Sequence, residues 1–262
     1  MGQGCRGLRC AHRLTEPRSP RGVGTVSYTS GMTAKNKDAQ SKAAKLSPTI
    51  TTRIATEIGN RIIDGVYRPG MSLREIPLSD ELGVSRGSVR EALRILERDG
   101  VVNIEARKGA SVTALSTDEL IEVYQVRSAL LGLAAVLACE RLTAADLQWL
   151  ASKLDEMKAA AGKSDAVAGA LHSTISSEMA AYFIERAGNR RLLTMLTQMG
   201  SQIARYTRIG LSTSERRSQS VETWQALVHA FANRQAAEAD QLARKLVKDT
   251  LRFALTRIAS LA

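Results

Sequence analysis

The chain has 262 residues, of which 44% are hydrophobic and 4% aromatic, and its formal net charge is +11. This length allows one large or two small domains, and the scarcity of aromatic residues favours packed helices over sheets. No apolar run approaches the roughly 18 residues of a membrane span, so we expect a soluble protein without a membrane partner. The cysteines, at positions 5, 10 and 139, exclude a disulfide framework and fit a reducing, cytoplasmic setting.

The positive charge is concentrated in residues 1–47, which carry a net +7, against +1 for residues 48–116 and +3 for residues 117–262. Bulk charge by itself therefore does not indicate DNA binding. Residues 1–47 are rich in Gly, Arg, Ser and Pro without an apolar period, which predicts a disordered basic tail. Either translation starts at Met32 and residues 1–31 are upstream sequence, or the tail contacts DNA phosphates.

Residues 48–115 show the element order of a winged helix-turn-helix. The pattern predicts a first helix from Thr49 that ends at Asp64-Gly65, a turn at "YRPGMSL" and a short helix over Ile76–Leu82. Ser85 then caps a third helix, which Asp99-Gly100 terminates. Two short strands, "VVNI" and "ASVTAL", are joined by the basic turn "EARKG".

The third predicted helix has one apolar and one basic face. Its inward face contains Val89, Ala92, Leu93 and Leu96. Its outward stripe contains Arg86, Arg90 and Arg94, and arginine can donate two hydrogen bonds to a guanine edge. From periodicity alone a second interpretation is equally open, in which these arginines pair with acids on a solvated face, namely Glu91, Glu97 and Asp99.

Three segments together resemble the GntR family of bacterial regulators: "RIIDGVYRPGMSL", "LGVSRGSVREALRILERDGVV" and "RKGASV". The resemblance implies that the operator contacts come from the start of the third helix, at Ser85, Arg86, Gly87, Ser88 and Arg90. It also implies that the wing tip lies at the minor groove, with Arg107, Lys108 and Gly109. The family often has a basic residue where this chain has Ile76, and Arg74 is the candidate substitute.

Residues 116–262 show only helical periodicity, with breaks that predict an antiparallel bundle of six helices and a mainly α fold overall. The segments "DELIEVYQVRSALLGLAAVLA" and "ERAGNRRLL" resemble the FCD domain of the FadR-type subfamily, in its shorter VanR-like group. This resemblance implies a domain for effector binding and dimerisation.

Domains of the FCD type usually hold a divalent metal through one Asp and three His. The corresponding positions here are Ser176, Ala180, Trp224 and Leu246. These side chains lack the carboxylate or imidazole donors that such an ion needs, so we predict neither a metal nor a cofactor. His172 and His229 lie off this register and are interpreted as ordinary core or surface histidines.

The resemblance places Arg127 where an arginine faces the ligand, so it could hold a carboxylate by a charge-assisted pair. The alternative is an ion pair with Glu122 or with an acid on a neighbouring helix. The other candidate effector-binding residues are Tyr124, Ser176, Ala180, Gln202, Arg205 and Trp224. Trp224 is equally compatible with simple core packing.

The sequence thus predicts a homodimeric repressor that binds palindromic double-stranded operator DNA and is released by a small organic, carboxylate-type effector. The competing hypothesis is an effector-independent DNA-binding dimer whose helical domain is only structural. An enzyme is not expected, because the chain shows no nucleophile–base pair, no clustered carboxylates and no phosphate-binding loop.

Overall fold

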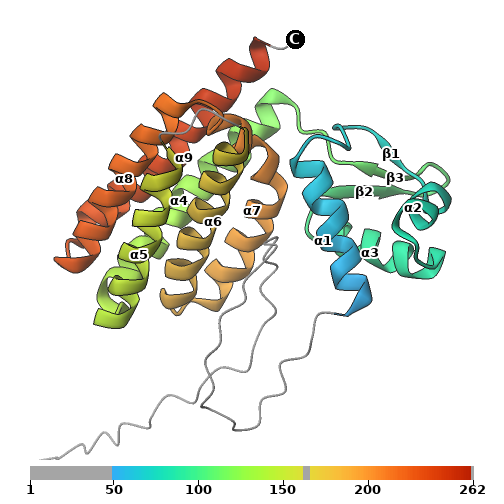
Figure 1. The fold of residues 1–262 in the computed structure, drawn as a ribbon. Helices are drawn as coiled ribbons and strands as arrows, with labels where there is room; N and C mark the ends of the chain where they lie inside the picture. The colour runs from blue at the N-terminus through green and yellow to red at the C-terminus, as the bar shows by residue number, and fades with distance from the viewer. Residues whose placement is uncertain (1–48, 162–165, 261–262) are drawn as a thin grey trace, which may run out of the picture.

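The computed structural model describes residues 49–161 and 166–260, which form two lobes (Figure 1). The smaller lobe contains α1 to α3 and a small sheet, and the larger lobe is a bundle of long helices. The predicted basic tail and the alternative start at Met32 lie outside the described residues, as does the predicted helix break at residues 162–165.

The smaller lobe is a winged helix-turn-helix. Its elements are α1 (Ile50–Ile63), β1 (Ser72–Leu73), α2 (Glu75–Leu82), α3 (Arg86–Arg98), β2 (Val102–Glu105) and β3 (Gly109–Val112). The three strands form an antiparallel sheet in the order β1-β3-β2. The apolar faces of α1 and α3 meet over this sheet in one core, which includes Ile58, Leu73, Val89, Leu96 and Val112.

Two of these helices end in the same way. Asp64 follows α1 and Asp99 follows α3, and each precedes a glycine in the left-handed region, with φ +82° at Gly65 and +72° at Gly100. Glycine adopts this conformation without the steric cost of a Cβ, which is why Asp-Gly predicted both helix ends.

Strand β1 is a finding that the sequence analysis missed, because "YRPGMSL" was interpreted as a turn throughout. Ser72 pairs with Ser111 and Leu73 with Ala110 of β3. Two residues are too few to show a period of two, so the pairing partner and not the local pattern defines this strand.

The larger lobe contains α4 (Thr117–Arg141), α5 (Ala144–Ala161), α6 (Ala166–Arg186), α7 (Arg190–Gly210), α8 (Ser214–Ala232) and α9 (Ala236–Ala259). Ser116 and Glu119 form a capping box at the start of α4, and the Asn189 side chain caps α7. The predicted fold class, a winged helix-turn-helix followed by a six-helix bundle, is confirmed.

Helix α4 corrects the expectation that no segment approaches a membrane span. Among the described helices it alone is long and apolar enough to cross a bilayer, with a mean hydropathy of 1.5 over 18 residues. Arg127 interrupts the apolar run of this helix, so its length as an apolar segment is not evident from the sequence. Helix α4 packs against α9, α6, α7 and α8 and is therefore the central helix of the bundle. This central position explains why the helix is rich in apolar residues.

Candidate DNA-binding surface and helical sensing domain

The start of α3 is exposed to solvent on the smaller lobe. The Ser85 hydroxyl caps the helix by accepting a hydrogen bond from the Ser88 backbone N–H at 3.1 Å. Arg86 and Gly87 are exposed, whereas Val89 is fully buried. A small, exposed first turn with free backbone N–H groups can approach a phosphate backbone closely.

Arg90 follows one turn later and is held by α2. Its guanidinium donates two hydrogen bonds to the Glu75 carboxylate, at 2.8 and 2.7 Å. The hydrogen bond from Arg90 lowers the pKa of Glu75, so this carboxylate stays ionised. Arg94 pairs with Glu91 at 2.9 Å. Two of the three arginines of the stripe, Arg90 and Arg94, are thus paired, in part as the second interpretation expected, although Glu75 is not one of the acids that it named.

The β2–β3 turn forms an exposed basic wing. Arg107 adopts the left-handed region at φ +69°, which is uncommon for a residue with a Cβ, and Gly109 follows at φ +86°. Lys108 pairs with Glu105 at 2.7 Å, and the side chains of Arg107 and Lys108 are exposed. This turn can therefore present two cationic side chains beside α3.

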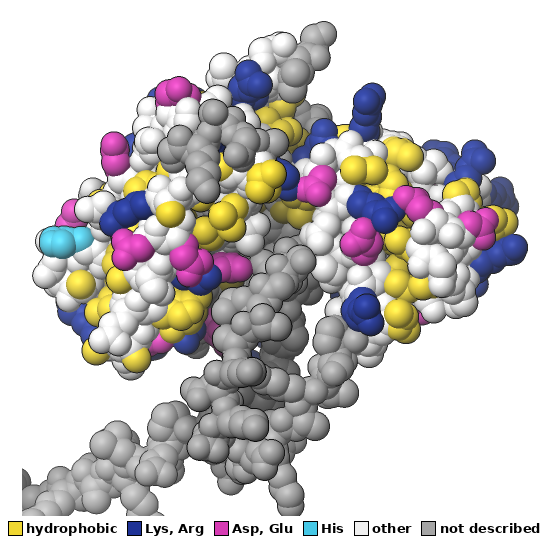
Figure 2. All heavy atoms as spheres, viewed as in Figure 1, with side chains coloured by type: hydrophobic (Ala, Val, Ile, Leu, Met, Phe, Trp, Pro, Cys, Tyr) yellow, Lys and Arg dark blue, Asp and Glu magenta, His cyan; other side chains and the backbone are white. Residues whose placement is uncertain are grey.

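Arg74, the residue that precedes α2, is exposed as well. Figure 2 shows Lys and Arg side chains projecting from the outer edge of the small lobe, away from the bundle. The smaller lobe thus places its cations at its rim, even though its net charge is close to zero.

Two family models match the chain. One, described as bacterial regulatory proteins of the gntR family, matches residues 50–112, and the other, the FCD domain, matches residues 122–249. The chain belongs to the GntR family. Both halves of the predicted resemblance, the DNA-binding domain and the FCD domain, are confirmed.

Similar proteins support the same assignment for this GntR chain. It is 34% identical over 104 residues to the HTH-type transcriptional regulator YdhC of Bacillus subtilis, covering 40% of this chain and 46% of the relative. It is 35% identical over 105 residues to the gluconate operon transcriptional repressor of Bacillus subtilis, covering 40% and 41%. The matches thus span about half the length of these relatives or less.

Solved structures show the same fold. The structure of E. coli McbR/YncC superposes with a TM-score of 0.69 at 19% identity, covering 80% of this GntR chain and 99% of that one. A GntR regulator from Rhodococcus sp. RHA1 superposes with a TM-score of 0.63 at 22% identity, covering 79% and 97%. At this level of identity the likeness concerns the fold alone.

The candidate effector residues fall into three groups, of which the first joins α4 to α7. Tyr124 is buried, and its hydroxyl lies 3.3 Å from the Thr207 hydroxyl. Arg127 donates a hydrogen bond to the Leu196 carbonyl at 2.8 Å, and burial lowers its pKa. Among the described residues Arg127 hydrogen-bonds to this backbone oxygen and not to Glu122, whereas its contact with an effector stays a prediction.

The second group lies at the four positions that the resemblance assigns to the metal ligands of the FCD family. The Trp224 indole N–H donates a hydrogen bond to the Ser176 hydroxyl at 3.0 Å. Trp224 also meets Phe183 edge to face, and Ala180 and Leu246 are buried. Ser176 on α6 thus contacts Trp224 on α8. The side chains at these four positions are one hydroxyl, one indole and two aliphatic groups.

We expect the purified protein to contain no stoichiometric zinc, manganese or nickel. One hydroxyl, two aliphatic side chains and an indole cannot replace the water that a divalent ion loses on binding. Elemental analysis measures this directly, and a chelator should leave the melting temperature unchanged. One tightly held metal per chain, with a melting temperature that falls in chelator, would contradict this expectation.

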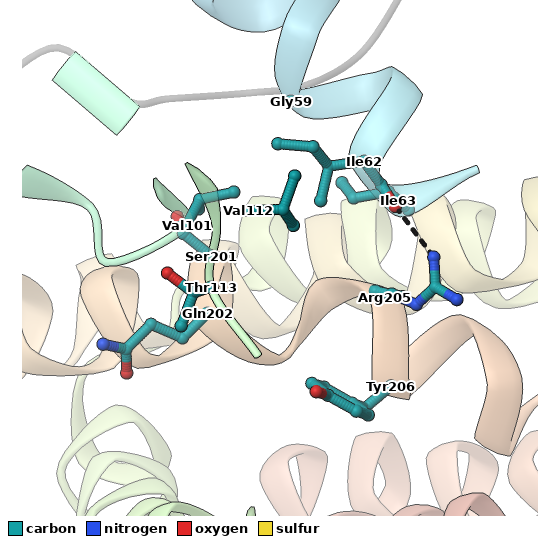
Figure 3. Close-up of a pocket in the computed structure, with 10 residues that line it drawn as sticks. All are labelled: Gly59, Ile62, Ile63, Val101, Val112, Thr113, Ser201, Gln202, Arg205 and Tyr206. Carbon is teal, nitrogen blue, oxygen red and sulfur yellow. Dashed lines mark hydrogen bonds between the residues drawn. The ribbon is translucent and has the colours of Figure 1, made fainter. Parts of the chain in front are cut away.

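The third group, Gln202 and Arg205, lies at the junction of the two lobes and not beside Trp224. Arg205 donates to the carbonyl of Ile62 in the last turn of α1 at 3.4 Å (Figure 3). Gln202 lies against Gly100, directly after α3. The junction encloses a cavity of about 20 Å³, lined also by Ile63, Val101 and Tyr206, which is room for about one water molecule.

Two residues that the sequence analysis did not consider complete this junction. Gln198 donates to the Arg98 carbonyl at 3.3 Å, and Arg208 forms an ion pair with Asp64. Together with Gln202 and Arg205 they form the α7 docking face. Because the last carbonyls of a helix lack intrahelical partners, donors on α7 stabilise the ends of α1 and α3.

Replacing Gly100 with alanine is expected to destabilise the protein more than replacing Gly70. Both glycines have a positive φ, so each change costs about 1–2 kcal/mol of backbone strain. A Cβ on Gly100 would also lie 2.2 Å from the Gln202 amide nitrogen, whereas nothing lies within 4 Å at Gly70.

Thermal unfolding of the two variants measures this difference, and Gln202→Ala combined with Gly100→Ala should remove most of it. Equal destabilisation by the two single substitutions would mean that α7 does not dock against Gly100.

Proposed function

We propose that the chain is a sequence-specific, DNA-binding transcriptional regulator, located in the cytoplasm and acting as a repressor. The observation that carries the proposal is the start of α3, where a small exposed first turn is followed by Arg90 on the outer face. In a helix-turn-helix this part of the second helix enters the major groove, where an arginine can bind guanine by two hydrogen bonds.

The predicted operator contacts lie on three parts of the smaller lobe, namely the start of α3, the wing and the residue before α2. Ser85, Arg86, Gly87 and Ser88 lie in or next to the first turn of α3, and Arg107, Lys108 and Gly109 lie on the wing. Arg74 precedes α2. We propose that the α3 residues contact bases and phosphates and that the wing residues contact the minor groove.

We further propose that two copies pair through α4. Val126 and Leu133, which are seven residues apart on α4, are 46% and 44% exposed. Ala129 is exposed between them, so an apolar stripe of α4 faces away from the bundle core. Pairing through this stripe would place two DNA-binding domains on one palindromic site.

The FCD domain is proposed to release DNA when it binds a small organic effector. The α7 docking face supports this proposal, because α7 contacts both the bundle core, through Leu196 and Thr207, and the ends of α1 and α3. A ligand shifts an equilibrium only when it binds one arrangement better than the other. Movement of α7 would couple such a preference to the position of α3.

Binding of the full chain to DNA fragments from the neighbourhood of its own gene tests this function. Fluorescence anisotropy should show one fragment bound at least about 1000-fold more tightly than a scrambled fragment of equal length. Equal affinity for all fragments would contradict the proposal. If such a fragment is found and no small molecule releases it, the helical domain is structural, as the competing hypothesis holds.

A further inference from the structure

A second group of polar side chains is buried in the bundle, away from the positions discussed above. His172 on α6 is 0% exposed, Arg216 in the first turn of α8 is 1% exposed, and Thr250 on α9 is buried. We name these three residues the buried cationic cluster. His172 and Thr250 lie about one helical turn from Ser176 and Leu246, and Arg216 lies about two turns from Trp224.

Four of the five side-chain nitrogens of Arg216 and His172 lack hydrogen-bond partners among the residues that the structure describes. Nε and one terminal nitrogen of Arg216 have none, and neither has either ring nitrogen of His172. The other terminal nitrogen of Arg216 reaches only the Thr250 hydroxyl, at 3.5 Å. Because buried polar groups in folded proteins are almost always hydrogen-bonded, the orphaned N–H groups of Arg216 and His172 indicate a missing acceptor.

The charge of Arg216 is not balanced either. Its contacts within the described chain include the ring of Phe253, 5.4 Å from the guanidinium carbon, but no carboxylate within ion-pair distance. Burial lowers the pKa of Arg216, whereas the charge of the Asp249 carboxylate raises it. This carboxylate, however, forms ion pairs with Lys245 at 2.7 Å and with Arg252 at 3.6 Å. A buried guanidinium without a counter-ion is strongly unfavourable, so the missing acceptor should be negatively charged.

The neighbouring residues fit an anion. Arg217, also buried, donates to the Ser212 carbonyl at 2.9 Å and adds a second positive charge to the region. Burial, followed by the charges of Arg217 and Arg216, lowers the pKa of His172 to about 4. The imidazole is therefore neutral at pH 7 and retains one N–H that it can donate.

We propose that the buried cationic cluster binds an oxyanion, the carboxylate or phosphate group of a small ligand. Arg216 supplies the charge and two N–H donors, and His172 supplies one donor. The Thr250 hydroxyl donates to the Leu246 carbonyl at 2.7 Å and accepts from Arg216, so it holds the guanidinium in place. A water molecule could accept the same hydrogen bonds, but it would leave the charge of Arg216 unbalanced. The assignment of this cluster as the effector site of the FCD domain rests on the proposed function, whereas anion binding itself does not.

Thermal unfolding of the full chain in sodium acetate, sodium phosphate and acetamide tests the proposal. Acetamide has the shape of acetate without its charge. We expect acetate or phosphate to raise the melting temperature saturably, by about 2–4 °C or more, while acetamide has no effect. The anion that acts at the lower concentration identifies the group as carboxylate or phosphate.

Arg216→Met removes the charge at similar volume, and Arg252→Met is the matched control, because Arg252 is exposed and lies beside Asp249. Arg216→Met should abolish the anion response without lowering the melting temperature in anion-free buffer, since it removes an unbalanced buried charge. Arg252→Met should keep the response. Equal effects of acetate and acetamide, or a full response in Arg216→Met, would overturn the proposal.

A measurement on the unsubstituted protein keeps the test valid if Arg216→Met does not fold. The chain has three histidines, so the imidazole nitrogen resonance missing in His172→Gln assigns His172. Acetate or phosphate should shift this resonance and leave that of the exposed His229 unchanged. A His172 resonance that neither anion moves would contradict anion binding. The proposed function has its own test, and it would be contradicted if the full chain bound all DNA fragments with equal affinity.

Discussion

Replacing Arg90 with alanine is expected to weaken binding to the cognate operator by about 5- to 150-fold and to relax the preference at one base pair. The guanidinium lies on the outer face of α3, one turn after the first, where a helix-turn-helix reads base edges. Its pair with Glu75 does not prevent this, because exposed ion pairs contribute little and exchange readily for a base contact. Fluorescence anisotropy with the operator and its single-base variants measures both effects.

Arg94→Ala is the matched control, because Arg94 lies one turn further from the start of α3 and pairs with Glu91. It should have the smaller effect and should not alter base preference. Glu75→Gln should instead strengthen binding to all DNA sequences, because it removes a negative charge beside the phosphates. If Arg90→Ala weakens binding equally on every sequence, Arg90 contacts only phosphates.

Replacing Leu133 with aspartate is expected to convert the proposed dimer to a monomer and to weaken operator binding by about 100-fold or more. A charged carboxylate in the centre of an apolar interface loses its hydration without gaining a partner. Each monomer then binds its half-site independently, so the gain in affinity from linking two DNA-binding domains is lost. Sedimentation analysis measures the mass, and anisotropy measures the affinity.

Leu171→Asp is the control for this change. Leu171 on α6 is 49% exposed, similar to Leu133, but does not belong to the α4 stripe. This variant should remain dimeric and bind DNA normally. A Leu133→Asp variant that keeps the mass and affinity of the original chain would place the dimer interface elsewhere.

The helix boundaries were the features most open to prediction from sequence. Asp64-Gly65, Asp99-Gly100 and Gly188-Asn189 end or start helices where predicted, because each glycine has a positive φ. The Ser85 cap and the inward face of α3 follow from local chemistry and a period of 3.6, neither of which depends on distant residues.

The features that were missed depend on partners far away in the chain. The Arg90–Glu75 pair links residues on two helices, and Arg127 hydrogen-bonds to a backbone carbonyl on α7. The burial of Arg216 contradicts the usual exposure of arginine, so neither composition nor periodicity indicates it. The position of Gln202 and Arg205 at the junction of the lobes likewise depends on how α7 packs, which the local sequence does not indicate, and their contact with an effector stays a prediction.

Selection of binding sites from random double-stranded DNA by the full chain tests the central claim most directly. The proposal that two copies of this chain read a palindrome through α3 predicts enriched sequences that converge on one inverted repeat. Its half-sites should be centred about one helical turn, or a multiple of it, apart. Binding that enriches no sequence and falls only with added salt would contradict specific recognition.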